Sequence, residues 1–237
     1  MSAAETMPKP ELVRVYVWDV VVRVTHWLIV LAILVLATTG FYIGRPFQAH
    51  TGPATPHFLM GWMRTIHFYT AIVFTVSVLA RIVWMFIGTR WARWTELVPV
   101  TRDRQVGLVK TLKFYLMLFR KPPDYVGHNP LAGASYGFIF LLFLVEVATG
   151  SALYGASATT SFMHPFASLL PWLGGAQIAR WIHHAVMWLL LGFMVHHVYS
   201  AILTSIVEKN GELDSIFSGN KFVEPHVLQQ ALDRRRT

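Results

Sequence analysis

The sequence predicts an all-α membrane protein in which four transmembrane helices form one bundle. The chain of 237 residues is 54% hydrophobic and only 14% charged, whereas soluble domains carry about 25% charged residues. Four apolar runs are each long enough to cross a bilayer, which takes roughly 20 residues. The basic residues are concentrated beside particular runs, so they also predict how the helices are oriented.

We expect the helices at about 24–44, 62–88, 130–155 and 178–207, within a single integral membrane domain that comprises residues 1–237. Asn129 suits the N-cap of the third helix, and Pro130 suits its first position. No N-terminal signal peptide is expected. The first apolar run follows about two dozen polar and mixed residues, and no small-residue cleavage site follows it.

The basic residues behind the net charge of +8 lie beside the ends of the apolar runs. This distribution does not indicate a nucleic-acid partner. The 89–129 connection is strongly basic, and both terminal segments, including the tail at 208–237, are basic as well. The residues in the connection are Arg90, Arg93, Arg102, Arg104, Lys110, Lys113, Arg120 and Lys121. The positive-inside rule therefore places both termini and this connection in the cytoplasm.

Within that connection, the segment Val106–Phe119 is apolar enough to lie along the inner membrane surface, with its lysines at lipid headgroups. A solvated helix is the alternative. The chain contains no cysteine, which excludes disulfides, thiolate ligation of haem and cysteine-bound iron–sulfur clusters in this chain.

Two histidine doublets lie in one apolar segment, residues 180–200. On a helix, each residue turns by about 100° and rises by about 1.5 Å. His183 and His197 therefore share a face and lie about 21 Å apart along the axis. The pairs that are 12 or 13 residues apart point in different directions. This helix can supply one axial ligand to each of two stacked haems.

The predicted topology pairs these ligands by depth. His67 and His183 lie near the outer ends of their helices, and His26 and His197 lie in the inner half. We therefore expect an outer haem between His67 and His183 and an inner haem between His26 and His197. Interhelical hydrogen bonding is the alternative role for each histidine. Zinc is disfavoured because its sites need three or four clustered ligands.

Four arginines are candidates for pairing with haem propionates. Arg23, Arg64 and Arg180 each precede a candidate ligand by three residues, and Arg81 is a charge within a span. Snorkelling at a helix end is the alternative for the first three.

Three other kinds of residue have open roles. His128, at the start of the third helix, is a candidate for passing protons to a quinone, or it makes a local turn hydrogen bond. Glu146 is a candidate proton relay whose direction is open. Hydrogen bonding or packing is the default role of His184 and His196.

The first and third helices end alike, with TTGFYIG at 38–44 and ATGSALYG at 148–155. Glycines at these positions would let a flat macrocycle approach the backbone. Close helix–helix contact is an equally good explanation of the small residues.

Five blocks together carry a resemblance to a known family. They are RVTHWLIVLAILVLATTG at 23–40, FLMGWMRTIHF at 58–68, GHNPLA at 127–132, TGSALYG at 149–155 and HHVYSAI at 196–202. With them the chain, from about Tyr16 to Phe222, resembles the b-type cytochrome subunit of membrane-bound nickel–iron hydrogenases, within the dihaem four-helix bacterial cytochromes b. The departures from this family include Ile182 before the ligand position, His184 after it, and Glu146 in place of an apolar residue.

The resemblance implies two haems b, ligated by His26, His67, His183 and His197, in a multi-pass protein of the bacterial inner membrane. It also implies partners, a catalytic nickel–iron subunit and an iron–sulfur small subunit. Electrons from hydrogen would pass through the haems to quinone. The chain would then be an electron-transfer subunit and would not itself cleave hydrogen.

Two alternatives remain at this stage. One is a cytochrome b that serves a formate dehydrogenase or a thiosulfate reductase, or that works without a partner. The other is a haem-free scaffold or transporter, in which the histidines are structural and no haem absorbance is expected.

Overall fold

The computed structural model describes residues 12–47, 58–116, 118–119, 125–159, 161–208 and 210–233. The expectations for Arg120 and Lys121 lie outside these ranges. Among the described residues, four helices are long and apolar enough to cross a membrane. They are α1 (Val20–Gly44), α2 (Leu59–Ile87), α4 (Pro130–Gly155) and α5 (Ala176–Glu208). The predicted all-α membrane fold is therefore confirmed.

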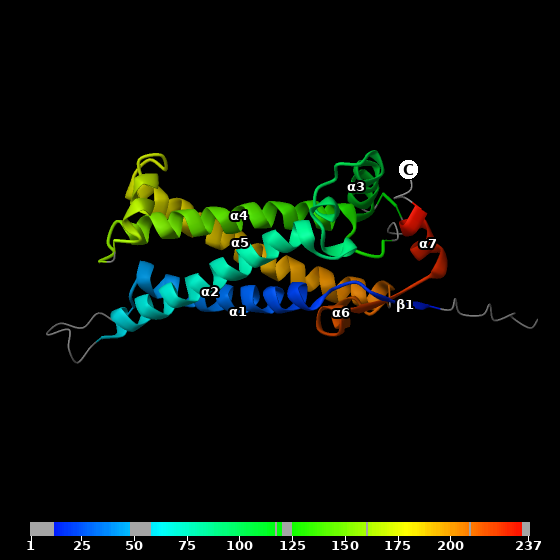
Figure 1. Ribbon diagram of the computed structural model, residues 1–237, viewed down its shortest axis with the longest axis horizontal. Coiled ribbons are helices and arrows are strands. Elements are labelled where there is room, and N and C mark those ends of the chain that lie inside the picture. The colour runs from blue at the N-terminus through cyan, green and yellow to red at the C-terminus, as the bar shows by residue number, and fades with distance from the viewer. Residues whose placement is uncertain are drawn as a thin grey trace, which may run out of the picture. The chain divides into compact units, whose positions relative to one another are not determined.

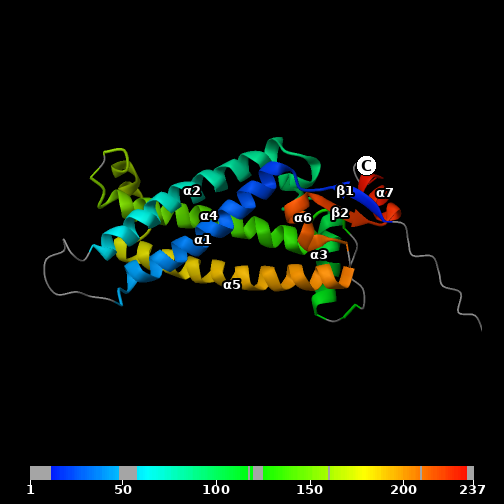
Figure 2. The ribbon, with the colours of Figure 1, turned by 90° about the horizontal axis from the view of Figure 1, so that it is seen from below.

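The chain divides into two compact units, which are described separately. One contains residues 21–87 and 136–198, and it is the bundle of long helices. The other contains residues 1–20, 88–135 and 199–237. In the bundle, α1, α2, α4 and α5 run lengthwise beside one another (Figures 1 and 2). A short 3₁₀ helix, η3 (His164–Leu169), lies in the connection between α4 and α5.

A layer of apolar side chains from all four helices forms the core of the bundle. Its members are Ile29 and Ala32 of α1, Phe74 and Val78 of α2, Ile139, Leu142 and Phe143 of α4, and Val186 and Leu190 of α5. Along α5 these residues fall between His183 and His197. The core therefore lies between the two histidine levels that the sequence predicts.

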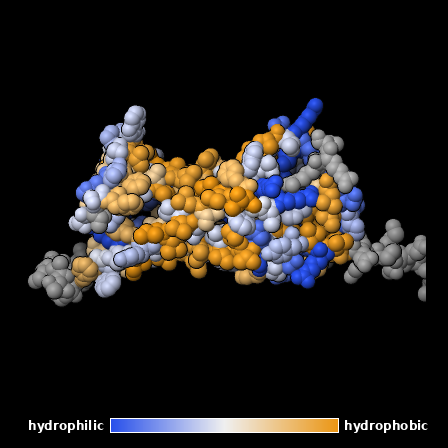
Figure 3. Space-filling view, in the orientation of Figure 1, coloured by the Kyte–Doolittle hydropathy of each residue, from blue (hydrophilic) through white to orange (hydrophobic). Residues whose placement is uncertain are grey.

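Large apolar side chains also cover the outside of the bundle. Leu31, Val76, Leu141 and Trp188 are each at least 58% exposed, and the flank of the long helices is predominantly hydrophobic in Figure 3. Such an apolar exterior is stable in lipid but not in water. Threonine hydroxyls inside the helices, such as that of Thr25, donate to the carbonyl four residues earlier, here that of Val21 at 2.7 Å. These bonds satisfy polar groups where no water is available.

The second unit joins the two ends of the chain. β1 (Val13–Tyr16) pairs antiparallel with β2 (Asn220–Val223), so that Val13 lies opposite Val223. α6 (Glu212–Ser218) precedes β2, and Gly219 connects them with φ of 84°. A Cβ at Gly219 would lie 2.6 Å from the carbonyl oxygen of Trp18. Glycine is therefore required at this turn both by its backbone angle and by the close approach.

A buried cation lies beside these strands. The side chain of Lys221 is only 2% exposed, and its ammonium group forms an ion pair with the carboxylate of Glu212. The ammonium also lies 5.6 Å from the ring centre of Trp18, whose indole N–H donates to the Ser215 hydroxyl at 3.0 Å. The tail, which the sequence predicts only as a polar segment, is thus folded against the N-terminal strand.

The remaining elements of this unit lie in the basic connection and the tail. They are η1 (Arg90–Ala92), η2 (Trp94–Glu96), α3 (Arg102–Tyr115) and, in the tail, α7 (Pro225–Asp233). Thr101 caps α3 by accepting from the backbone N–H of Arg104. Asn129 caps α4 by accepting from the N–H of Ala132 at 2.8 Å, which confirms the predicted helix start.

Candidate functional site

The four predicted ligands lie within the bundle, and each is half-buried. His26 comes from α1, His67 from α2, and both His183 and His197 from α5. His184 and His196, which spacing excludes, are exposed. The described residues contain no cluster of three or more His, Asp or Glu side chains that could hold a metal ion.

His26 and His197 approach each other directly. Their ring centres are 6.3 Å apart, with an angle of 59° between the ring planes. The Nδ1 atom of His26 is buried and makes no hydrogen bond to the described residues. The ring of His197 stacks on that of Phe193, 5.7 Å away, and its Nδ1 lies 3.3 Å from the hydroxyl of Tyr136. This pair therefore joins α1 to α5.

His67 of α2 and His183 of α5 are the second predicted pair, and each lies against a threonine of a neighbouring helix. Nδ1 of His67 lies 2.9 Å from the hydroxyl oxygen of Thr39. That hydroxyl donates its own hydrogen to the carbonyl of Val35 at 2.7 Å. The oxygen therefore accepts from the imidazole, so Nδ1 carries the proton and Nε2 keeps its lone pair.

The surroundings of His183 repeat this arrangement. Its Nδ1 lies 2.9 Å from the hydroxyl of Thr149, and that hydroxyl donates to the carbonyl of Val145 at 2.7 Å. The Glu146 carboxylate lies 2.5 Å from the same Nδ1. The sequence leaves the direction of Glu146 open, and the structure places it against this histidine.

Glycine follows threonine in both places and gives each imidazole room. A Cβ on Gly40 would lie 3.4 Å from Cε1 of His67, and one on Gly150 would lie 3.3 Å from Cε1 of His183. The two Thr–Gly echoes in the sequence are therefore contact surfaces for imidazole rings. The echoes signal such a surface, but the sequence does not show which rings lie on it.

The candidate arginines have different surroundings. Arg81 is buried, and its guanidinium carbon lies 6.0 Å from the ring centre of Phe140. Arg64 and Arg180 are exposed, and Arg180 donates to the side-chain oxygen of Gln177 at 3.2 Å. Arg23 is half-buried near the start of α1. Pairing of these side chains with propionates stays a prediction.

His184 and His128 make contacts that the sequence does not specify. Nδ1 of His184 lies 2.8 Å from the carbonyl oxygen of Arg180, the hydrogen-bonding role expected by default. His128, in the other unit, stacks on Trp18 with ring centres 4.5 Å apart.

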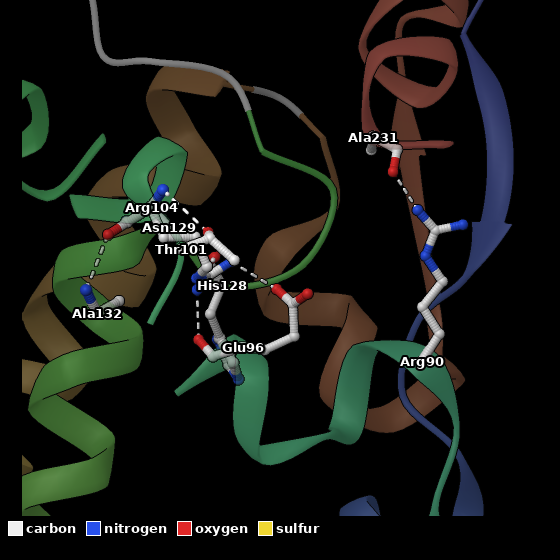
Figure 4. Close-up of polar contacts among 8 residues, drawn as sticks. All are labelled: Arg90, Glu96, Thr101, Arg104, His128, Asn129, Ala132 and Ala231. Atoms are coloured by element: carbon white, nitrogen blue, oxygen red, sulfur yellow. Dashed lines mark hydrogen bonds and ion pairs between the residues drawn. The ribbon is translucent and has the colours of Figure 1, made fainter. Parts of the chain in front are cut away.

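The backbone around His128 is fixed by a neighbouring ion pair. Its carbonyl accepts from Arg104, which binds the Glu96 carboxylate at 2.8 Å (Figure 4). Its role at a quinone site stays a prediction.

Comparison with known proteins gives a consistent family. Residues 17–219 match the family model described as prokaryotic cytochrome b561. A "Probable Ni/Fe-hydrogenase B-type cytochrome subunit" of Cupriavidus necator is 39% identical over 208 residues, which cover 86% of this chain and 85% of that protein.

Two other relatives agree. A "Probable Ni/Fe-hydrogenase 1 B-type cytochrome subunit" of Escherichia coli K12 is 37% identical, with 86% and 89% covered. An Azotobacter vinelandii relative is 34% identical, with 92% and 94% covered. Cytochromes b bind haem b. With its four membrane-spanning helices and a family match over most of its length, this chain belongs to the prokaryotic cytochrome b561 family, as a multi-pass bacterial membrane protein.

Proposed function

We propose that this chain is the dihaem membrane anchor of a respiratory uptake nickel–iron hydrogenase. In this role it carries electrons from a hydrogenase iron–sulfur subunit outside the cytoplasm to quinone in the membrane. The observation that carries the proposal is the approach of His26 to His197 between α1 and α5, with an apolar core between this pair and the level of His67 and His183.

The inner pair has the spacing that a shared metal ion needs. An imidazole nitrogen lies about 2 Å from a metal it ligates, and the ring centre lies roughly 1 Å further away. Two imidazoles on opposite sides of one iron therefore have centres about 6 Å apart. The 6.3 Å between the ring centres of His26 and His197 fits this value, so these two residues would hold the iron of one haem b.

At the outer pair, the Nε2 atoms of His67 and His183 are available to bind iron. Thr39 and Thr149 hold the protons of His67 and His183 on Nδ1, which leaves the Nε2 lone pairs available. Gly40 and Gly150 let the rings lie close to the helices. Haem b, once bound at each level, supplies reversible one-electron chemistry.

Charged side chains complete the proposed sites. We assign Arg64 and Arg180 to the propionates of the outer haem, and Arg23 and Arg81 to those of the inner haem, because guanidinium groups bind carboxylates strongly. His128 is assigned to a quinone on the cytoplasmic side, where it would exchange protons with the bound quinone. Labelling of inner-side residues should decrease with a bound quinone analogue, and protection of outer loops alone would contradict this side.

The comparisons and the absence of cysteine support the proposed partners. The similar proteins are described as hydrogenase cytochrome subunits. This chain has no cysteine, so cysteine-bound iron–sulfur clusters must be held by another subunit. Membranes that carry a tagged chain should yield a nickel–iron subunit and an iron–sulfur subunit on purification. Recovery of a formate dehydrogenase instead would contradict the hydrogenase assignment.

The haem sites are tested by a reduced-minus-oxidised spectrum and a pyridine haemochrome assay. We expect two haems b per chain, one of which is lost in His67→Ala and the other in His197→Ala. His184→Ala is the matched control, because this neighbour of His183 is exposed and already bonded to its own helix. Absence of haem from the unaltered chain, made in haem-replete cells, would overturn the proposal.

A further inference from the structure

His67 lies against α1, and His183 lies against α4. The contacts that these two helices make with the imidazoles are alike except at one position. In α1 the contacts come from Thr39 and Gly40, and in α4 from Thr149 and Gly150. Both threonine oxygens lie 2.9 Å from the imidazole Nδ1 that they contact. A Cβ on either glycine would meet the ring at nearly the same distance, 3.4 or 3.3 Å.

The difference lies three residues before each threonine. In α1 this residue is Leu36, whose side chain carries no charge and no hydrogen-bonding group. In α4 it is Glu146, whose carboxylate oxygen Oε2 lies 2.5 Å from Nδ1 of His183. Among the described residues, His67 thus contacts neutral acceptors, whereas His183 also faces a carboxylate.

The position of Glu146 is costly for a carboxylate. Its side chain is 11% exposed within a helix that spans the membrane, and its other oxygen, Oε1, is buried without a hydrogen bond to the described residues. Burying a carboxylate requires compensation by hydrogen bonds or by opposite charge. Among the described residues, the His183 imidazole supplies this compensation.

A carboxylate in this position changes the donor strength of the other imidazole nitrogen, Nε2. When Nδ1–H donates to a carboxylate, the ring becomes more electron-rich and Nε2 becomes a stronger donor to a metal. A stronger donor stabilises the oxidised, more positive iron relative to the reduced iron. The threonine contacts cannot produce a difference between the two rings, because they are alike.

We propose that Glu146 is a positioning residue that strengthens His183 as a ligand and lowers the reduction potential of the haem held by His67 and His183. This inference rests on the proposed haem ligation by His183. It concerns one of the two haems, since His26 and His197 lie beyond the apolar core of the bundle.

The test is a redox titration of the full-length chain with both haems bound, followed by absorbance at one fixed pH. Glu146→Gln keeps the shape of the side chain and removes its charge. We expect Glu146→Gln to raise the equilibrium constant for reduction of one haem by about tenfold. For one electron, this raises the reduction potential of that haem by about 59 mV. Glu146→Leu reproduces the α1 arrangement and should shift the same transition at least as far. Glu146→Asp should restore part of the original value.

Two further variants assign and control the measurement. His197→Ala should retain only the haem held by His67 and His183. The single redox transition of this variant therefore identifies the transition that Glu146→Gln should shift. Leu36→Glu places a carboxylate at the equivalent position beside His67, and it should shift that transition in the opposite direction. The low-spin ferric EPR signal of the same haem should change in Glu146→Gln, while that of the other haem stays unchanged.

The outcomes separate this inference from the proposed function. Two haems with unmoved transitions in both Glu146→Gln and Glu146→Leu would overturn the inference and leave the dihaem assignment intact. Loss of a haem in both variants would also overturn it, because the carboxylate would then serve haem retention. An unaltered chain with fewer than two haems would overturn the proposed function itself.

Discussion

At the residue scale, Glu146 places a carboxylate beside one of the four predicted ligands, His183. The choice of His183 and His197 over their neighbours follows from helical geometry alone and stays a prediction; in the structure, His184 and His196 are exposed. The contacts of the rings were not predictable, because they depend on which helices pack together. Glu146 is the clearest case, since its direction could be assigned only once α4 and α5 had been placed side by side (Figure 2).

The threonine hydroxyls provide a test at this scale. Thr39→Val removes a hydroxyl acceptor of His67 and changes little else, so it should cost about 1 kcal/mol at that imidazole. We expect faster loss of one haem when the purified chain is challenged with detergent, measured by the fall in haem absorbance. Thr38→Val is the matched control, because the Thr38 hydroxyl bonds only to the Leu34 carbonyl of its own helix. Equal rates for the two variants would contradict the role of Thr39.

At the element scale, the long helices were predictable and the two short strands were not. The apolar runs predict the membrane-spanning helices, and Asn129 and Pro130 predict where α4 begins. Both signals are local in the sequence. β1 and β2 are four residues each and about 200 residues apart in the chain. Their pairing depends on contacts such as that of Trp18 with Gly219, for which the sequence has no periodic signal.

The ion pair beside these strands predicts a large effect from a small change. Glu212→Gln leaves the Lys221 ammonium buried without its carboxylate, and breaking such a pair costs about 3–5 kcal/mol. Because Glu212 is 24% exposed, we expect about 3 kcal/mol. Limited proteolysis should then cleave the C-terminal segment faster while the haem content stays unchanged. Glu224→Gln, in an exposed pair with His226, should have no such effect.

At the scale of the whole molecule, the distribution of charge predicts sidedness. Basic residues in the 89–129 connection and in both terminal segments predict that these parts lie in the cytoplasm. A fluorescent protein fused after residue 237 should fluoresce. Alkaline phosphatase fused in the 45–58 or 156–177 connection should be active, because it needs an oxidising compartment. The reverse pattern would invert the assignment of inner and outer haems.

The apolar core has a consequence for energy conservation. All nine residues in this layer are hydrocarbon or aromatic side chains, and they offer no hydrogen-bonding group along which a proton could hop. Electrons can tunnel through packed side chains of this kind, whereas ions cannot pass through them. In the proposed function, this layer would therefore insulate the two histidine levels from each other, and a voltage built across it by electron transfer would not be lost through proton leak.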